Sequence, residues 1–512
     1  MKMKLLVFLN LIFVFFTITM SQNNNLTILP SNDVITWAKA YVEFMPSSSS
    51  SIIETSDGGF MVMGYTLNPY NGEFNILLIK LNKNGKIIWD KMYGGKNYST
   101  HGTSIVETPD EEFLMAGKIL LSDQSQFKIL LAKLDFNGNI LWAKTYDENG
   151  IGETIRLVNV SDGGYILLGF TNSNITGNSK VLVIKLNSSG EEIWAKAYEI
   201  PDNNYYISTV VETLDSGFLV VGGIYSQDAE GYKPFVFKID SNGNISWGKT
   251  YSCPENFQLS SAVEAGDGGT IISGTVVLEN QLPDGVVIKL TSTGKVKWAK
   301  AIGGSSYDGL NSITKTSDGK FVSSGYTRSF GAGNTDLFLM KFDENANIIW
   351  NKRFGEFRTN EVSNCIVETS DGGLISAGSI RDFSSSSNFL VVKTDSEGNI
   401  EDCSYMVDCS PDITPLNLEE NFKIPIANNS ELNISNFSLP SEDLFLSVKK
   451  ICVKKGDIND DGVVDMRDIV YFANYFTENH NEMPDDTSNW DMNEDGKITL
   501  SDLILLIIKV EG

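Results

Sequence analysis

Seven tryptophans recur along the chain at intervals of 51 to 53 residues, and this regularity constrains the fold more than any other feature of the sequence. They are Trp37, Trp89, Trp142, Trp194, Trp247, Trp298 and Trp350. A lysine follows each of them two residues later, and each interval also contains an aspartate-containing turn and a further lysine. A period near 50 residues is typical of supersecondary units that stack in a row or close into a ring.

Each repeat contains four short segments that are rich in β-branched and aromatic residues. In the first repeat these are residues 51–55, 60–66, 74–81 and 86–93. Asp57-Gly58-Gly59 separates the first two segments and Asn84-Gly85 separates the last two, and glycines there can supply the positive backbone angles of a tight hairpin. Four antiparallel strands repeated seven times predict an all-β, seven-bladed propeller, with the tryptophans filling the space between neighbouring blades.

The two ends of the repeat region favour a closed ring over an open solenoid. The seventh repeat has Asp402 and Cys403 where the others have tryptophan, whereas residues 33–42, which include Trp37, stand alone before the first repeat. We expect residues 33–42 to supply the missing outer strand of the last blade by pairing with residues 398–403 or their neighbours. The propeller then spans residues 33–403 and lacks the exposed sheet edge of an open array.

The N-terminus has the layout of a secretory signal. Lys2 and Lys4 precede an apolar run from Leu5 to Ile18, and a cleavage site follows at residues 19–21. We predict a signal peptide over residues 1–21 and a secreted protein that is extracellular or held at the cell surface. An uncleaved membrane anchor is the alternative, although the run is short for the roughly 20 residues that a spanning helix needs.

The net charge of -25 argues against nucleic acid as a partner, since phosphate binding needs a basic surface. The loops between the second and third strands differ in every repeat, and variable loops on a rigid scaffold are where binding specificity usually lies. We expect a glycan or a surface protein to bind there. The loops are residues 68–72, 122–126, 172–178, 226–232, 279–284, 329–334 and 382–387.

Catalysis has little support in the sequence. The two histidines, His101 and His480, do not recur and lie beside no recognisable nucleophile, so no catalytic residue is assigned. An acid and base pair of carboxylates across the ring would make the protein a propeller glycosidase or a polysaccharide lyase. Regular repeats without a distinctive insertion in one blade favour a binding or scaffolding role instead.

Residues 404–455 lack the repeat. They contain four prolines and several asparagines and serines, a composition that predicts an extended, loosely structured linker. One short strand is predicted within it, at residues 444–448.

Five cysteines in a secreted chain suggest that some are paired. Cys403 and Cys452 are the preferred pair, because their bond would tie the linker back to the closure site, and Cys403 with Cys409 is the alternative. Cys365 occupies a strand position in its repeat and is expected to be a buried free thiol, whereas Cys253 lies in a loop.

Two 12-residue loops near the C-terminus, residues 457–468 and 491–502, place oxygen-bearing side chains at positions 1, 3, 5, 9 and 12 and glycine at position 6. Loops of this EF-hand type wrap a hard cation and use the backbone carbonyl of position 7 as a further ligand. We therefore predict two Ca²⁺ ions. The ligands are Asp457, Asn459, Asp461, Val463, Asp465 and Asp468 in the first loop and Asp491, Asn493, Asp495, Lys497, Thr499 and Asp502 in the second.

Apolar residues at helical spacing follow each loop, so each loop is expected to lead into a helix. Residues 456–512 carry 14 acidic and 3 basic side chains, a net charge of -11. Because so small a module has little core and its carboxylates repel, calcium should contribute much of its folding free energy.

This duplicated loop and helix pattern closely resembles the dockerin family over residues 456–512. In that family aspartate at position 12 replaces the usual EF-hand glutamate, as Asp468 and Asp502 do here. The resemblance implies calcium-dependent docking to a cohesin module, typically in extracellular complexes that degrade plant polysaccharide or in surface assemblies. The family's partner-choosing pair maps onto Met466-Arg467 and Leu500-Ser501. The repeat region is similar to secreted propeller repeats of surface proteins, a resemblance that implies no activity.

The sequence therefore predicts a secreted or cell-surface propeller with a non-catalytic binding or scaffolding role, docked through a calcium-dependent, dockerin-like module to a cohesin-type partner. A propeller glycosidase or polysaccharide lyase of an extracellular polysaccharide-degrading complex is the alternative. A purely structural surface-layer component is a third interpretation.

Overall fold

The computed structural model describes residues 34–511 and has two compact units, one of residues 36–453 and one containing residues 454–512. The predicted signal peptide, residues 1–21, lies outside the described residues. Within residues 34–511 the structure does not describe residues 43–44, 69–71, 96–97, 122–126, 148–152, 173–178, 201–204, 227–230, 253–254, 279–280, 332–333, 383–385, 402, 423–425, 430–432, 437–440, 444–445, 453–454, 460, 462, 478–488 and 493–497.

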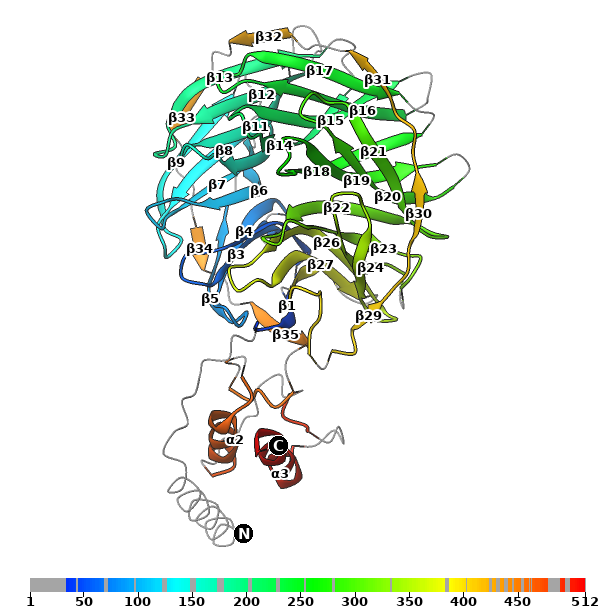
Figure 1. Cartoon of the computed structure of the whole chain (residues 1–512). Coiled ribbons are helices and arrows are strands. Elements are labelled where there is room, and N and C mark those ends of the chain that lie inside the picture. Colours follow the sequence, from blue (N-terminus) through cyan, green and yellow to red (C-terminus); the bar gives the residue numbers. More distant parts are fainter. Residues whose placement is uncertain are drawn as a thin grey trace, which may run out of the picture. The chain divides into compact units, whose positions relative to one another are not determined.

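The first unit is a ring of seven antiparallel sheets, or blades (Figure 1). The first strands of neighbouring blades contact one another all the way round, including the first strands of blades 7 and 1, so they surround the axis and the ring is closed. The prediction of an all-β seven-bladed propeller is confirmed.

In every blade the first four strands are hydrogen-bonded side by side, from the innermost strand outwards. Blade 1 contains β2 (Ser47–Glu54), β3 (Phe60–Leu67), β4 (Phe74–Leu81) and β5 (Ile87–Tyr93); blade 2 contains β6 (Tyr98–Glu107), β7 (Phe113–Leu121), β8 (Phe127–Leu134) and β9 (Ile140–Asp147). Blade 3 contains β10 (Glu153–Asn159), β11 (Tyr165–Asn172), β12 (Ser179–Leu186) and β13 (Glu192–Glu199); blade 4 contains β14 (Tyr205–Glu212), β15 (Phe218–Ser226), β16 (Gly231–Ile239) and β17 (Ile245–Ser252). Blade 5 contains β18 (Asn256–Glu264), β19 (Thr270–Val277), β20 (Pro283–Leu290) and β21 (Val296–Gly303); blade 6 contains β22 (Asp308–Lys315), β23 (Phe321–Thr327), β24 (Asp336–Phe342) and β25 (Ile348–Phe354). Blade 7 contains β26 (Thr359–Glu368), β27 (Leu374–Asp382), β28 (Asn388–Thr394) and β1 (Trp37–Val42).

The N-terminal strand β1 closes the ring, but its partner differs from the predicted segment. It pairs with β28, from Trp37 opposite Lys393 to Tyr41 opposite Phe389, and not with residues 398–403. The reason is that residues 395–399 form the tight turn that in other blades joins the third strand to the fourth, with Gly398 at a φ of 74°. The chain leaves the blade after this turn because β1 already occupies the fourth position.

The repeated lysine and the repeated aspartate form one ion pair inside every blade. The lysine comes from the third strand and the aspartate from the turn between the first and second strands, at distances of 2.5 to 3.0 Å. The lysine side chains are at most 12% exposed, so each buried ammonium needs its partner, and the pair fixes the turn against the third strand. The pairs are Lys80–Asp57, Lys133–Asp110, Lys185–Asp162, Lys238–Asp215, Lys289–Asp267, Lys341–Asp318 and Lys393–Asp371.

The repeated tryptophans pack each blade against the next. The Trp37 indole donates a hydrogen bond to the carbonyl of Lys83 in blade 1 (3.1 Å), and Tyr41 donates one to the carbonyl of Gly85 (2.7 Å). Gly85 has a φ of 72°, and a β-carbon there would lie 2.8 Å from the Trp37 ring. Glycine is therefore required both for the turn and for the close approach of the neighbouring indole.

The described strands between residues 406 and 452 form a second layer that the sequence did not predict. Seven short strands, which we call the belt, add a fifth, outermost strand to each blade in turn, passing back round the whole ring (Figure 1). In chain order they join blades 6, 5, 4, 3, 2, 1 and 7. They are β29 (Met406–Asp408), β30 (Asp412–Pro415), β31 (Glu419–Phe422), β32 (Ile426–Asn429), β33 (Asn433–Asn436), β34 (Ser441–Asp443) and β35 (Ser447–Cys452).

The prediction of a loosely structured linker over residues 404–455 is therefore wrong for the belt. Its backbone groups pair with the outer strand of every blade, for example Tyr198 of β13 with Ala427 of β32. Pro415 is tolerated in β30 because a belt strand is a sheet edge, where one side needs no ladder hydrogen bonds. The strand predicted at residues 444–448 begins later, at Ser447.

A disulfide joins the two ends of the belt, between Cys403 and Cys452, the pair preferred from the sequence. The two Cα atoms are 5.4 Å apart although the residues are 49 apart in sequence. Among the described residues Cys365 and Cys409 are free, and Cys365 is buried as expected, whereas Cys253 lies outside the described residues. The alternative pairing of Cys403 with Cys409 does not occur.

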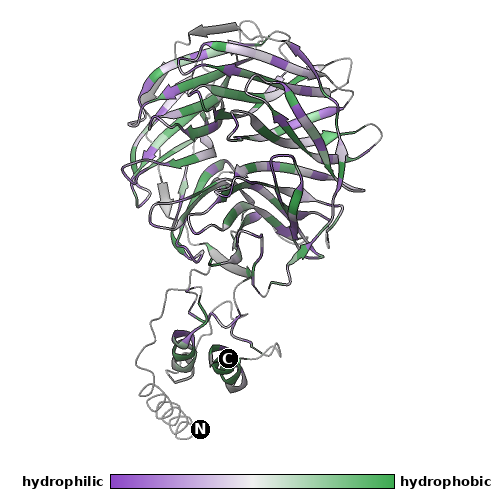
Figure 2. Ribbon diagram, viewed as in Figure 1, coloured by the Kyte–Doolittle hydropathy of each residue, from purple (hydrophilic) through white to green (hydrophobic). Residues whose placement is uncertain are grey.

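The apolar core of the ring lies within and between the blades. Figure 2 shows apolar segments along the strands of the blades, flanked by hydrophilic segments. One core cluster combines Leu168 and Val181 of blade 3 with Ile207 and Val220 of blade 4. None of the helices within the described residues is long and apolar enough to cross a membrane.

A buried acidic group lies between blades 6 and 7. Glu361 of β26 is fully buried near Asp336 of β24, and Asp336 forms an ion pair with Arg353 at 3.1 Å. Burial raises the pKa of Glu361 to about 7, and the negative charge of Asp336 adds to this effect. Arg353 offsets one carboxylate, so ionisation of Glu361 leaves a second buried negative charge without full compensation.

We expect the ring to lose stability as Glu361 ionises. The pKa of the group is higher in the folded state than in the unfolded state, so the free energy of unfolding should fall as pH rises from about 4.5 to about 7, by up to about 3 kcal/mol. Glu361→Gln should remove this loss and be more stable than the wild type at pH 8 but not at pH 4. Urea unfolding of both chains across this range measures the difference.

The exposed Glu397→Gln is the matched control for the loss of one carboxylate. Equal pH profiles for the wild type and Glu361→Gln would contradict the assignment.

Candidate metal-binding site

The described part of the C-terminal module contains two helices, each preceded in the sequence by one of the acidic loops. They are α2 (Met466–Thr477) and α3 (Leu500–Glu511). The two helices pack together over a small core that includes Ile458, Phe472, Trp490, Leu503 and Leu506. Each loop is therefore held at the N-terminal end of a helix, where the helix dipole favours negative charge.

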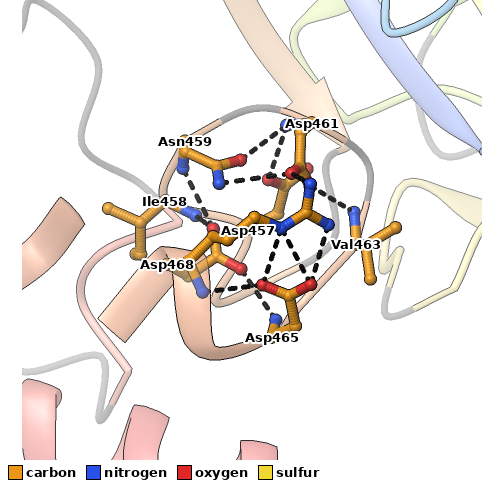
Figure 3. A network of polar contacts seen from close by, with 8 residues as sticks. Asp457, Ile458, Asn459, Asp461, Val463, Asp465 and Asp468 are labelled. Carbon is orange, nitrogen blue, oxygen red and sulfur yellow. Dashed lines mark hydrogen bonds and ion pairs between the residues drawn. The ribbon is translucent and has the colours of Figure 1, made fainter. Parts of the chain in front are cut away.

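The first loop gathers its oxygen-bearing side chains on its inner side (Figure 3). The carboxylate of Asp457 accepts a hydrogen bond from the amide of Asp461 at 3.0 Å, and the side-chain oxygen of Asn459 accepts another from the same amide at 2.9 Å. The amide of Val463 donates to the Asp461 carboxylate at 3.0 Å, which holds the chain in the turn at positions 5 to 7.

The aspartate at position 12 joins the two ends of each loop. In the first loop Asp468 accepts hydrogen bonds from the amides of Ile458 (2.7 Å), Asn459 (3.0 Å) and Asp465 (2.8 Å). In the second loop Asp502 makes the equivalent bonds to the amides at positions 2 and 9, both of them also close to 3 Å. Both aspartates are fully buried, and burial raises the pKa of Asp468.

The residue at position 9 begins each helix. Asp465 accepts a hydrogen bond from the Arg467 amide at 2.7 Å, and Thr499 accepts one from the Ser501 amide at 3.2 Å. These side chains satisfy amides of the first turn that have no partner within the helix. The sequence predicted both residues as ligands but not this capping role, which an aspartate or threonine directly before a helix could have indicated.

Hydrogen bonds link all six predicted ligand residues of the first loop, from Asp457 to Asp468, to one another. In the second loop Asp491, Thr499 and Asp502 are described, whereas Asn493, Asp495 and Lys497 lie outside the described residues. The donor set suits calcium, which prefers carboxylate, amide and carbonyl oxygens. Within the described residues the side chains of Asp, Glu, His and Cys form no group of three that could hold an ion by themselves.

Arg467 lies between two of the first-loop carboxylates. Its guanidinium pairs with Asp461 at 2.8 Å and with Asp465 at 2.7 Å, while 61% of its side chain stays exposed. The hydrogen bond from Arg467 is the main reason that the pKa of Asp465 is lowered. Arg467 thus offsets charge within a loop whose carboxylates would otherwise repel one another.

The predicted partner-binding residues lie at the start of the two helices. Arg467 and Ser501 are exposed and Met466 is half-buried, while the side chain of Leu500 lies outside the described residues. The helices also expose apolar side chains that were not predicted from the sequence. They are Val470 (51%), Tyr471 (53%), Ile504 (41%), Leu505 (37%) and Ile508 (59%).

Two of these exposed apolar positions are repeated. Val470 and Ile504 both lie 13 residues after the first aspartate of their loops, and Tyr471 and Leu505 lie one residue further on. The duplication of the loops is thus accompanied by a duplicated exposed apolar pair. Aligning the two loop and helix units would have found these residues in the sequence.

The described residues of the ring's loop surface form no comparable cluster of predicted ligand residues. Each of the seven variable loops lies wholly or partly outside the described residues. His101 of β6 packs against the rings of Tyr65 and Phe74, with ring centroids 5.3 and 4.8 Å apart, whereas His480 is not described.

Residues 455–511 match the family model of the dockerin type I domain. Domains of this type bind calcium, and they imply a cohesin partner. No curated protein matches the chain.

Several solved structures are similar to the ring at low sequence identity. A protein of unknown function from Dyadobacter fermentans is 10% identical, with 71% of this chain and 98% of that chain covered and a TM-score of 0.39. The acylaminoacyl peptidase of Pyrococcus horikoshii is 11% identical (65% and 49% covered, TM-score 0.37). An α-L-arabinofuranosidase from Fusarium graminearum is 9% identical (70% and 98% covered, TM-score 0.34). Likeness at this level carries no conclusion about function.

We expect Asp468→Ala to destabilise the C-terminal module by at least about 2 kcal/mol, since three amides lose a charged acceptor. Asp502→Ala should act similarly on the second loop. Helical circular dichroism of the full chain during urea unfolding measures the change, because the described helices of at least eight residues all lie in this module. Asp486→Ala, which changes the charge outside both loops, is the control, and equal effects of all three substitutions would contradict the assigned role.

Proposed function

We propose, from the premise that residues 455–511 are a dockerin type I domain carried by a seven-bladed propeller, that this is a secreted or cell-surface protein whose ring is a non-catalytic binding or scaffolding unit. The module attaches the ring to a cohesin-type partner when it holds calcium. The ring is then the cargo, and its variable loops contact a glycan or a surface protein. Secretion rests on the N-terminal apolar run of the sequence.

The observation that carries the docking proposal is the duplicated exposed apolar pair on the two helices. Val470 and Tyr471 on α2 and Ile504 and Leu505 on α3 are between 37 and 53% exposed. Apolar and aromatic side chains that stay exposed in a small, highly charged module mark a contact surface for another protein. Because the pair occurs twice, the partner can bind either helix face.

We assign two calcium ions to the module, one in each loop. Asp457, Asn459, Asp461, Asp465 and Asp468, with the carbonyl of Val463, would hold the first ion, and the equivalent residues from Asp491 to Asp502 would hold the second. Calcium would compete with Arg467 for Asp461 and Asp465, and a displaced Arg467 would be available to an acidic group of the partner. This change would couple calcium to partner choice at the Met466-Arg467 pair.

Two buried carboxylates of the ring, Asp284 and Glu361, are poorly placed for catalysis, which agrees with a non-catalytic role. Asp284 has a pKa raised to about 6, by burial first and then by the charge of Asp308, and Glu361 has a pKa raised to about 7. Such values suit general acid catalysis, but Glu361 is fully buried and Asp284 is 7% exposed. A general acid must reach the leaving group of its substrate, which these positions between blades do not favour.

The docking proposal is tested with the full chain as bait and a purified cohesin module as prey, in calcium and in chelator. We expect binding in calcium alone, and two calcium ions per chain by isothermal titration. Tyr471→Asp and Leu505→Asp should each leave the other helix face intact for binding, so each should change the Kd for cohesin only a few-fold. The double variant should weaken cohesin binding at least 100-fold. Phe357→Asp, at an apolar ring residue that is 75% exposed, is the control.

If calcium folds the module but the wild-type chain binds no cohesin of a broad panel, docking is excluded. If chelator leaves binding unchanged, the assigned role of calcium is wrong.

The non-catalytic role of the ring is tested on a panel of soluble polysaccharides. Affinity electrophoresis should show retarded migration on at least one of them, and reducing-sugar assays should show no turnover. Sugar release by the purified chain would identify an enzyme instead. A chain that neither binds nor cleaves any glycan would direct the search to a protein ligand.

A further inference from the structure

The belt lies directly between the ring and the C-terminal module in the chain. Residue 453 follows β35, the last belt strand, and the module begins at residue 454. This inference rests on the proposed function, in which one partner holds the docked module and another partner holds the ring. Any tension between them therefore enters the ring at Cys452.

Hydrogen bonds alone would resist that tension poorly. Among the described strands, β35 is outermost in its sheet and pairs with β1 alone, from Ala38 opposite Cys452 to Val42 opposite Ser447. A strand pulled from one end loses its hydrogen bonds one after another rather than together. Behind it the remaining six belt strands have only three or four residues each, so they would detach from one blade after the next.

Loss of the belt would also leave one edge of β1, the strand that closes the ring, without a hydrogen-bonded neighbour. β1 is held between β28 and β35, and without β35 it becomes the edge of its sheet. The other six blades would likewise expose the unpaired side of their fourth strands. Unpaired strand edges invite pairing with other chains.

The disulfide provides a different path for the tension. Cys452 is bonded to Cys403, and from there the chain runs back through Ile400 to β28, an interior strand held between β27 and β1. Ile400, Tyr405 and Cys452 are buried in one core cluster together with Phe354 and Leu390. The load therefore reaches the interior of blade 7 without passing through residues 404–451.

We propose that the belt and its disulfide are a mechanical anchor, in which the Cys403–Cys452 bond carries tension from the docking module into blade 7 and keeps the belt on the ring. The anchor has a measurable length. Without the disulfide, release of the belt would add 49 residues to the extended chain, or about 170 Å at roughly 3.5 Å per residue.

Single-molecule force spectroscopy on the full chain tests this anchor. One handle is placed at the C-terminus and the other at position 214, where Leu214 lies exposed in a turn of blade 4. In the oxidised wild type we expect extension of the C-terminal module and then none until the ring unfolds. The Cys403→Ser/Cys452→Ser variant should show an additional extension of about 170 Å at lower force, in several small steps.

Cys409→Ser, which removes a free cysteine that lies within the belt, is the matched control and should behave as the wild type. If the double variant does not fold, the folded wild type is reduced in the measuring chamber and should gain the same extension. Indistinguishable traces for oxidised and reduced chains would overturn the proposal, as would loss of the belt in the oxidised chain. Cohesin is absent from this experiment, so its outcome is separate from that of the docking test.

Discussion

The backbone amide and carbonyl groups at the open edge of a sheet must find partners, and this requirement shapes the whole ring. Closure by β1 gives blade 7 its fourth strand, and the belt then pairs the outer side of the fourth strand of all seven blades. The belt strands have three to six residues, so the edges that remain are short. Short, interrupted edges are one way in which natural sheet proteins avoid pairing with other chains.

Within this frame each blade is fixed by polar contacts that repeat with the sequence. The buried lysine of the third strand pairs with the aspartate of the first turn in every blade, and in blade 4 Lys238 and Thr213 together lower the pKa of Asp215 to about 2. In blade 7, Trp37 and Tyr41 of the fourth strand contact the last turn of blade 1. A buried charge costs free energy unless it is paired, so these contacts specify one register for each turn.

Charges in the blades are paired, whereas the C-terminal module has an excess of carboxylates in its two loops and few basic side chains to offset them. Asp468 and Asp502 use backbone amides to close the loops, and Arg467 supplies positive charge in the first. The apolar residues left exposed on the helices form the contact surface that we propose for the partner. The loop carboxylates thus determine the shape of the loops and supply the proposed calcium ligands, and the helices that follow the loops carry the proposed docking residues.

The sequence by itself determined the local features: strand period, tight turns, the number of blades and the two acidic loops, since each depends on residues close together in the chain. Only the tertiary structure decided how distant segments pair. The lysine and aspartate repeats were visible, but not that they form ion pairs 22 or 23 residues apart. The belt strands are too short for any hydrophobic period, and their partners lie from 52 to 414 residues away, so this proline-containing segment resembled a linker. The tertiary structure also decided the partner of β1, which is β28, the third strand of blade 7.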